Sequence, residues 1–449
     1  MQRLVDRWNA DYFDGRLSPE ACQLLDGLEE APAEACAFAE RIFRLMRASR
    51  FDAADVSSLL AWEIGVIAPR ILPNAWGGMV PPITAAGRHG KIDNYVAANP
   101  WRRRAAAPGH PRVMLDLGCG FPPLTTMDSA ERLSDWCVIG ADPAFGRYMV
   151  YDVKGDYACF ADEEDIRYFQ PGIVDEARWE ALYRDHPATR ARFRDLLHAL
   201  LPLLPEPDEG ELQEVERDGA RLVRNAIRRY ERPNLTFLEG GIGSSLELGE
   251  PVDVIRCMNV LIYFDRPFRD KALRWAAPLL VEDGLFICGM NWTKSSHARY
   301  CVYRKESGRL VPREFAFGIE NVRPIEFIAW YTLHDDDPDA LLLAELVGEL
   351  RSDDDFRRGF DERLDALLAE VGMCPRGPDG YLAGLPEDAT PGELVERLTT
   401  LLDRLRASGL TDSAVKVLRA AGREAWRNCV GDVATLPVES TIVLSCSAG

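Results

Sequence analysis

The stretch 112–142 constrains the fold more than any other part of the chain. It begins with a short apolar run, RVMLDLG, passes through a glycine-containing loop, GCGFPP, and continues into LTTMDSAERLSD, which has the composition of a helix. A second apolar run, WCVIGAD, follows at once. Apolar runs separated by a helical segment are typical of parallel strands in an α/β sheet. We therefore predict a strand, a loop, a helix and a second strand in this order.

The next strand candidate comes only after a long gap. It is LTFLEGG at 235–241, about ninety residues downstream of the second strand. Because a parallel connection needs only a dozen or so residues, we predict a helical insertion at about 150–232. Two of its segments, DEARWEALYRDHPATRARFRDLLHALLPLL and GARLVRNAIRRYER, have helical patterns. In the second segment a helix would place four arginines on one solvated face, namely Arg221, Arg224, Arg228 and Arg232.

After the gap the alternation resumes. PVDVIRCMNVLIYF predicts a strand and a loop, RPFRDKALRWAAPLLVEDG a helix that ends at Gly284, and LFICGMNW another strand. ARYCVYRKESGRLVPREFAFG predicts a hairpin with Ser307 and Gly308 in its turn. The fold class that these patterns predict is α/β, a Rossmann-like doubly wound and mostly parallel sheet.

The 449 residues are too many for one hydrophobic core, so we predict three parts. Residues 1–100 form a helical N-terminal region, in which Phe38, Ile42, Phe43 and Met46 recur at helical spacing. Residues 101–335 form the α/β domain with its insertion. Residues 336–449 form a mostly helical extension, and its last apolar run, STIVLSCSAG, is a strand or a tail.

The glycine loop limits which cofactor fits this fold. In dinucleotide sites, backbone N–H groups at a helix N-terminus bind the pyrophosphate, and a third glycine permits close packing. Gly118 and Gly120 supply two glycines, but Pro122 and Pro123 follow. Proline has no N–H, so two donors are missing where phosphates would bind. The loop therefore disfavours a nicotinamide oxidoreductase and favours a cofactor without phosphates.

S-adenosylmethionine is such a cofactor, with an adenosine, a sulfonium and an amino-acid end. Gly118, Cys119 and Gly120 would allow its close approach to the backbone, and Asp116 would bind its ammonium group. Asp142, at the end of the next strand, would accept hydrogen bonds from both ribose hydroxyls. DLGCG followed by GADP in this order resembles the class I S-adenosylmethionine-dependent methyltransferases.

A second segment, 251–305, is similar to the chemotaxis-receptor glutamate methyltransferases, which share the sequence NVLIYF. VYRK at 302–305 also resembles the closing strands of that family. By this resemblance Asn259 and Val260 lie beside the methionine end of the cofactor. The same resemblance implies that Tyr263 lies near the transferred methyl group.

Methyl transfer from a sulfonium is an in-line displacement, which depends on positioning more than on a catalytic side chain. Tyr263 is the catalytic candidate, as a group that positions the acceptor. The segment MNWTKSSHARY follows a strand at the carboxyl edge of the sheet, where open α/β folds bind ligands. Asn291, Trp292 and His297 are therefore substrate candidates. Since no HxH or HExxH spacing occurs, we expect no catalytic metal.

Composition restricts the binding partners and the cellular location that we expect for the protein. The formal net charge of −19 and the pI near 4.9 argue against general nucleic-acid binding, which needs a basic face. Eleven cysteines without a CxxC pair fit neither a disulfide framework nor a zinc site. The N-terminal residues do not resemble a signal peptide, and no apolar run approaches the ~18 residues of a membrane span. We therefore expect a cytoplasmic protein that does not associate with membranes.

These observations predict an S-adenosylmethionine-dependent methyltransferase with an unidentified acceptor. A small molecule is favoured, since the additional helical segments would close over one, and a protein carboxylate is the alternative. A protein that keeps the cofactor fold only for binding or as a scaffold is the alternative from another functional class. The sequence leaves the oligomeric state open.

Overall fold

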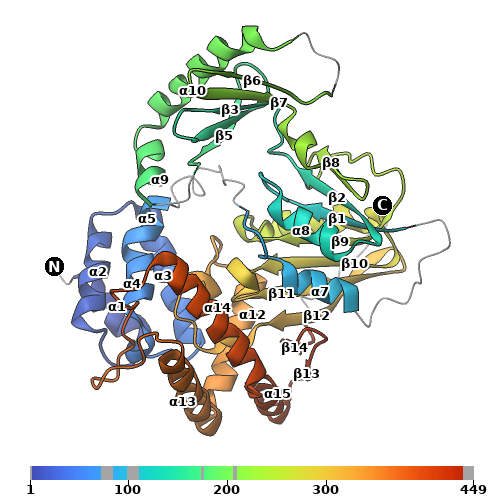
Figure 1. Cartoon of the computed structure of the whole chain (residues 1–449). Coiled ribbons are helices and arrows are strands. Elements are labelled where there is room, and N and C mark those ends of the chain that lie inside the picture. The colour runs from blue at the N-terminus through green and yellow to red at the C-terminus, as the bar shows by residue number, and fades with distance from the viewer. Residues whose placement is uncertain (1–2, 72–83, 99–110, 173–175, 206–209, 438–449) are drawn as a thin grey trace, which may run out of the picture.

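A large sheet occupies the centre of the molecule, as the computed structural model shows for residues 3–71, 84–98, 111–172, 176–205 and 210–437 (Figure 1). Within these residues the sheet has nine strands in the order β13-β14-β12-β11-β10-β9-β1-β2-β8. The strands are β1 (Arg112–Leu117), β2 (Trp136–Asp142), β8 (Leu235–Glu239), β9 (Val252–Met258), β10 (Leu280–Met290), β11 (Arg299–Glu306), β12 (Arg309–Phe317), β13 (Ala425–Arg427) and β14 (Val433–Thr435).

Half of the strand pairs in this sheet are parallel. Strands β8, β2, β1, β9 and β10 pair in parallel, whereas β11, β12, β14 and β13 extend the sheet with antiparallel pairs. The chain runs outward from β1 through β2 to β8, then returns to β9 on the other side of β1. The predicted α/β sheet is thus confirmed for five strands, and its strand order reverses between β1 and β9.

Helices cover both faces of the sheet. On one face lie α7 (Gly90–Ala98) and α8 (Leu124–Arg132), and on the other lie α3 (Ala33–Ala48), α11 (Arg266–Ala276) and α12 (Pro338–Ser352). Among the described residues, the other α-helices outside the insertion are α1 (Leu4–Tyr12), α2 (Pro19–Asp26), α4 (Ser58–Trp62), α5 (Ala68–Ile71), α13 (Asp354–Glu370), α14 (Pro391–Ala407) and α15 (Leu410–Ala420).

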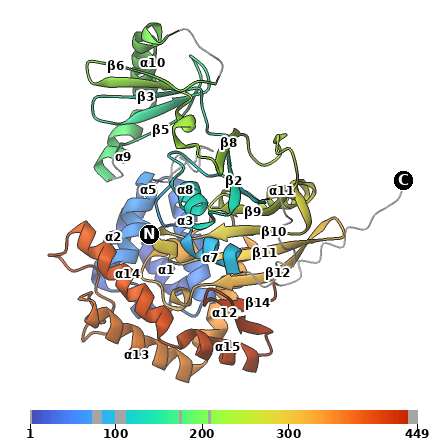
Figure 2. The ribbon, with the colours of Figure 1, turned by 45° about the vertical axis from the view of Figure 1, so that its right-hand side comes forward.

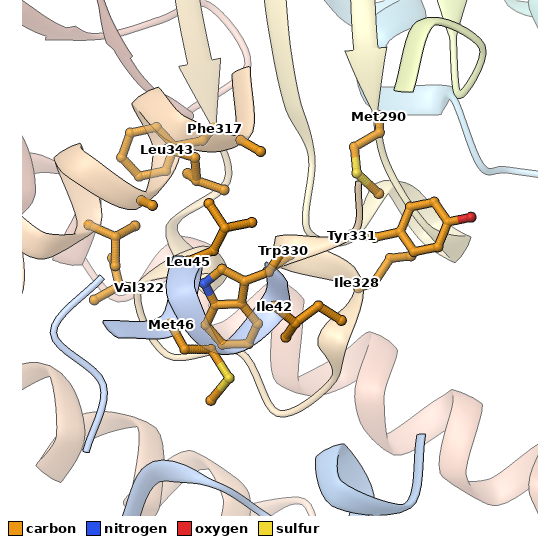
Figure 3. Close-up of a cluster of buried hydrophobic side chains, with 14 of the residues drawn as sticks. Ile42, Leu45, Met46, Met290, Phe317, Val322, Ile328, Trp330, Tyr331 and Leu343 are labelled. Carbon is orange, nitrogen blue, oxygen red and sulfur yellow. The ribbon is translucent and has the colours of Figure 1, made fainter. Parts of the chain in front are cut away.

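The N-terminal helices share a core with the sheet and with the C-terminal helices. The four residues predicted at helical spacing, Phe38, Ile42, Phe43 and Met46, are all fully buried on α3. Figure 3 shows Ile42 and Met46 beside Trp330, which belongs to the turns that follow β12. One hydrophobic cluster therefore runs from the N-terminal region through the sheet to α12 and α13.

The insertion contains a second sheet, which corrects the prediction of a helical insertion. Its antiparallel order is β5-β4-β3-β7-β6, and it carries two helices over its described residues (Figures 1 and 2). These elements are β3 (Tyr148–Tyr151), β4 (Tyr157–Phe160), β5 (Ile166–Gln170), α9 (Glu176–Tyr183), α10 (His186–Leu200), β6 (Gln213–Arg217) and β7 (Ala220–Arg224). In both views α9 lies beside α5 of the N-terminal region.

The segment GARLVRNAIRRYER shows why the helical prediction failed. It forms β7 and a 3-10 turn at Ala226–Tyr230 in place of a helix. Asp218 and Gly219 both have left-handed backbone angles, φ 53° and 79°, which is the geometry of a tight hairpin turn. This turn pairs Arg217 with Ala220, so Arg221 and Arg224 lie on a strand and not on a helical face.

Two further boundaries can be compared with the prediction. The helix expected to end at Gly284 ends at Ala276, and β10 runs through Gly284 with a register shift between Leu280 and Leu285. The predicted hairpin is confirmed, with Ser307 and Gly308 in its turn. The run STIVLSCSAG at 440–449 lies outside the described residues.

Candidate functional site

The candidate site lies at the carboxyl ends of β1 and β9. Strand order reverses between these two neighbours, and in open α/β sheets such a switch point is where ligands bind. The segments that follow β1, β2, β9 and β10 all reach this edge, because the four strands are parallel. They carry nearly all of the residues that the sequence predicts for the site.

The glycine loop after β1 requires its glycines. Gly118 and Gly120 have left-handed φ values of 73° and 71°. A Cβ atom on Gly118 would lie 2.3 Å from Cγ2 of Val260, so the loop packs directly against the segment after β9. Cys119 is buried beneath the loop, where its Sγ atom would lie 3.1 Å from a Cβ atom on Gly140 of β2. Two predicted cofactor residues, Gly118 and Val260, are thus in contact.

Asp142 at the end of β2 holds the glycine loop in place. Its Oδ2 atom accepts a hydrogen bond of 2.8 Å from the Gly120 N–H, and its Oδ1 atom accepts one of 2.7 Å from the Ala144 N–H. Burial raises the pKa of this carboxyl, although both hydrogen bonds oppose the shift. Each oxygen of a carboxylate has a second lone pair, so two acceptor positions remain. That Asp142 binds a ribose stays a prediction.

Asp116 lies at the same edge, but its carboxylate already has partners. The Arg256 guanidinium donates from Nε to Oδ1 over 2.9 Å and from Nη2 to Oδ2 over 2.6 Å. The Thr126 hydroxyl donates to Oδ2 over 2.6 Å. Asp116 is therefore tied to β9 and α8, and the prediction that it binds an ammonium group is untested.

Arg256 is a site residue that sequence reasoning missed. It is fully buried and also donates from Nη1 to the Asp93 carboxylate of α7 and to the Ser129 hydroxyl of α8, each over 2.6 Å. Burial raises the pKa of Asp93 to about 6, even though Arg256 opposes this shift. The signal that would have identified it is an arginine in the middle of the largely apolar strand VDVIRCM, since a buried charge requires a partner.

Asn259 and Asn291, both predicted, are brought together at the ends of β9 and β10. The Asn291 N–H donates to Asn259 Oδ1 over 2.9 Å, and Asn259 has a left-handed φ of 59°. Asn291 also donates from Nδ2 to the Arg88 carbonyl over 2.6 Å, and its Oδ1 lies 3.0 Å from His89 Nδ1. Burial lowers the pKa of His89 well below its usual value, so this imidazole is neutral.

Arg88 interacts with both Trp292 and Tyr263. The Arg88 guanidinium stands 5.2 Å from the ring centroid of Trp292, which is 40% exposed. Arg88 also acts electrostatically on the Tyr263 hydroxyl, and the Tyr263 ring packs edge-on against that of Tyr331, with 6.2 Å between the ring centroids. Burial raises the pKa of Tyr263, so this phenol is protonated at neutral pH. Arg88 and His89, in the segment GRHGK, were not predicted as site residues.

His297 faces a different environment from the other substrate candidates. Its backbone N–H donates to Glu320 Oε1 over 3.0 Å, and its Nδ1 atom lies 4.0 Å from Glu326 Oε2. Burial lowers the pKa of His297 to about 4. It lines a cavity with α14, whereas Asn291 contacts His89 and Asn259.

Two kinds of feature are absent from the described residues. No three histidine, cysteine, aspartate or glutamate side chains there gather in the geometry of a metal site. Among the same residues, every helix is too short or too polar to cross a bilayer.

Comparison with known proteins gives only distant similarities. No family model matches the chain, and no curated protein matches it. One aligned structure is the plantazolicin methyltransferase BpumL in complex with SAH, at 12% identity and a TM-score of 0.23 over 57% of this chain. That alignment spans 62% of BpumL, which is less than two thirds of its length. Another is a putative protein-L-isoaspartate O-methyltransferase from Plasmodium falciparum in complex with S-adenosyl-L-homocysteine. Its identity is 12% and its TM-score 0.21, over 62% of this chain and 94% of that one. TM-scores this low assign neither a fold family nor a function.

Proposed function

We propose that this protein is an S-adenosylmethionine-dependent methyltransferase whose cofactor binds at the switch point between β1 and β9. The observation that carries the proposal is the hydrogen bond of 2.8 Å between the Gly120 N–H and Asp142 Oδ2. It joins a glycine loop that lacks two amide donors, at Pro122 and Pro123, to an acid at the tip of the next strand. This combination suits a nucleoside that carries hydroxyls and no phosphate.

The residues present fit the nucleoside part of the cofactor. Asp142 retains two acceptor positions, which is the number that the two ribose hydroxyls need. Gly120 has a positive φ, a backbone conformation that glycine adopts without strain, and its N–H is held by Asp142. Pro122 and Pro123, in contrast, offer no amide donors to a pyrophosphate.

The residues at the ends of β9 and β10 would position the acceptor. When bound, the cofactor supplies an electrophilic methyl group on a sulfonium. Tyr263 is protonated and its ring packs against Tyr331, so it orients an acceptor by hydrogen bonding and does not act as a base. Neutral His89 is fixed through Asn291 at the same edge. A small molecule is the favoured acceptor and a protein carboxylate the alternative.

A second candidate function is a binding or scaffold role without catalysis. The specific observation in its favour is that Asp116 and Asp142 both have internal partners. Arg256 and Thr126 engage both oxygens of Asp116, and backbone N–H groups engage both oxygens of Asp142. A chain that had lost its cofactor would keep these contacts, because they also stabilise the fold.

Calorimetry separates the two functions. We expect S-adenosylmethionine and its demethylated product to bind the full-length protein, and NADH not to bind. Asp142→Ala should abolish this binding. The matched control is Asp162→Ala, because exposed Asp162 also accepts two backbone N–H groups, both at 2.9 Å, away from the switch point. Binding of neither nucleoside by the folded wild-type protein would refute the methyltransferase and favour the scaffold.

A further inference from the structure

A cavity lies beneath α14, apart from the proposed cofactor site. Its volume is about 60 Å³, which exceeds the space that one water molecule occupies. One wall consists of apolar side chains of α14, including Leu398, Leu401, Leu402 and Leu405. The opposite wall is polar and comes from the segments after β10 and β12. The cavity thus has the two-sided character of a small-molecule site.

The polar wall contains buried atoms without partners among the described residues. His297 and Glu320 are 5% and 4% exposed. His297 Nδ1 and Glu320 Oε2 have no hydrogen-bond partner there. The Glu326 carboxylate also lines the cavity, and its distance of 4.0 Å from His297 Nδ1 is too long for a hydrogen bond. Buried polar atoms are nearly always satisfied in proteins, so these two acceptor atoms on one cavity wall indicate a missing donor.

The charges around the cavity favour a partner that donates hydrogen bonds. Although burial opposes it, Arg406 and Lys91 hold the pKa of Glu320 below its usual value, so this carboxylate is ionised. His297, with its pKa of about 4, is neutral and accepts at Nδ1 when Nε2 carries the proton. Arg323 also lines the cavity; Asp361 and Asp365 bind its Nη atoms, while its Nε atom has no partner among the described residues and would be satisfied by an acceptor or a water molecule.

We propose that this cavity binds a small primary amine. Its ammonium group would donate hydrogen bonds to Glu320 Oε2 and His297 Nδ1, and its short alkyl chain would pack on the leucines of α14. The exposed residues Thr293 and Lys294 lie at the rim and give access from solvent. The site shares no residue with the glycine loop or Asp142, so it goes beyond the proposed methyltransferase function and does not depend on it.

n-Butylamine tests the proposal, with n-butanol and butyrate as neutral and anionic molecules of similar size. Each is titrated into full-length protein labelled with ¹⁵N-histidine, at pH 7 and constant ionic strength, and the imidazole ¹⁵N signals are recorded. Only n-butylamine should shift the His297 signal saturably, with a dissociation constant on the order of millimolar. His198, half-exposed on the insertion, is the internal control and should not shift. Equal shifts with n-butanol or butyrate, or no shift of His297 with n-butylamine, would overturn the proposal.

Variants then locate the site. Leu402→Trp fills the cavity from α14 and should abolish the shift, whereas Leu341→Trp, on an exposed position of α12, should leave it unchanged. Because Leu402→Trp perturbs packing, its fold is checked by circular dichroism, and Glu320→Gln provides a second variant of nearly unchanged size. It should weaken binding at least tenfold, and undiminished affinity would contradict the assigned contact. These readouts use no S-adenosylmethionine, so their failure would leave the proposed function untouched.

Discussion

Arg256 and Asp116 face each other across the strand pair at which the sheet reverses its order. They are partners in the parallel register of β1 and β9, and the guanidinium holds both carboxylate oxygens, at 2.9 and 2.6 Å. The same guanidinium reaches Asp93 of α7. One buried cation therefore joins two strands and a helix directly beneath the candidate site.

Replacing Arg256 by methionine should destabilise the protein strongly. Asp116 and Asp93 would then lie buried without a cation, and breaking a buried pair from one side typically costs about 3–5 kcal/mol. The measurement is the free energy of unfolding in urea at pH 7. Arg357→Met is the matched control, because its ion pair with Asp354 lies on the surface and should contribute less than about 1 kcal/mol. Similar losses in the free energy of unfolding in the two variants would show that the buried ion pairs of Arg256 do not stabilise the packing of β1, β9 and α7.

Asp93 should make stability depend on pH below neutrality. Burial raises its folded-state pKa to about 6, above the value in the unfolded chain. Between about pH 4 and 6 the folded protein therefore holds a proton that the unfolded chain releases, so stability falls as the pH rises through this window. The difference in the free energy of unfolding between the wild type and Asp93→Asn should fall by up to about 3 kcal/mol as the pH rises from 4 to 7.

Urea titrations of both proteins at pH 4, 5, 6 and 7 measure this difference, in which the contributions of other titrating groups cancel. Parallel stability profiles would mean that the pKa of Asp93 is the same in the folded and unfolded states.

The central strands and the hairpin were predictable because their signals are local. Apolar runs mark β1 and β2, and Ser307 and Gly308 mark the hairpin turn. The second sheet was not predicted, because its strands have only four or five residues, and β7 also contains helix-favouring alanine, leucine and arginine. The decisive signal was the Asp218-Gly219 pair, which favours a two-residue hairpin over a continuous helix.

The residues of the candidate site also fall into two groups, those that local sequence patterns predict and those that only tertiary packing brings there. Gly118, Asp142 and Asn259 could be placed at the candidate site from the sequence, because each ends or follows an apolar strand and the ends of parallel strands meet at one edge. Arg88 and His89 come from a segment without such a pattern, and only tertiary packing brings them to Asn291. His297 was grouped with Asn291 by proximity in sequence, but the chain turns between them and His297 faces α14.

Gly118→Ala should cost more than an ordinary substitution at a left-handed glycine. The left-handed backbone alone costs a residue with a side chain about 1–2 kcal/mol. The added Cβ atom would also lie 2.3 Å from Val260 Cγ2, and overpacking of this kind adds about 1–3 kcal/mol.

Gly308→Ala is the matched control, because its φ of 77° is similar and no atom lies within 4 Å of the added Cβ. Urea unfolding should thus show a larger loss for Gly118→Ala, and the double variant Gly118→Ala, Val260→Ala should recover the excess, since removing the two γ-methyl groups removes the clash. Equal losses in the free energy of unfolding at the two glycines would mean that the glycine loop can move away from Val260. The contact between the glycine loop and the segment after β9 would then not be a rigid feature of the site.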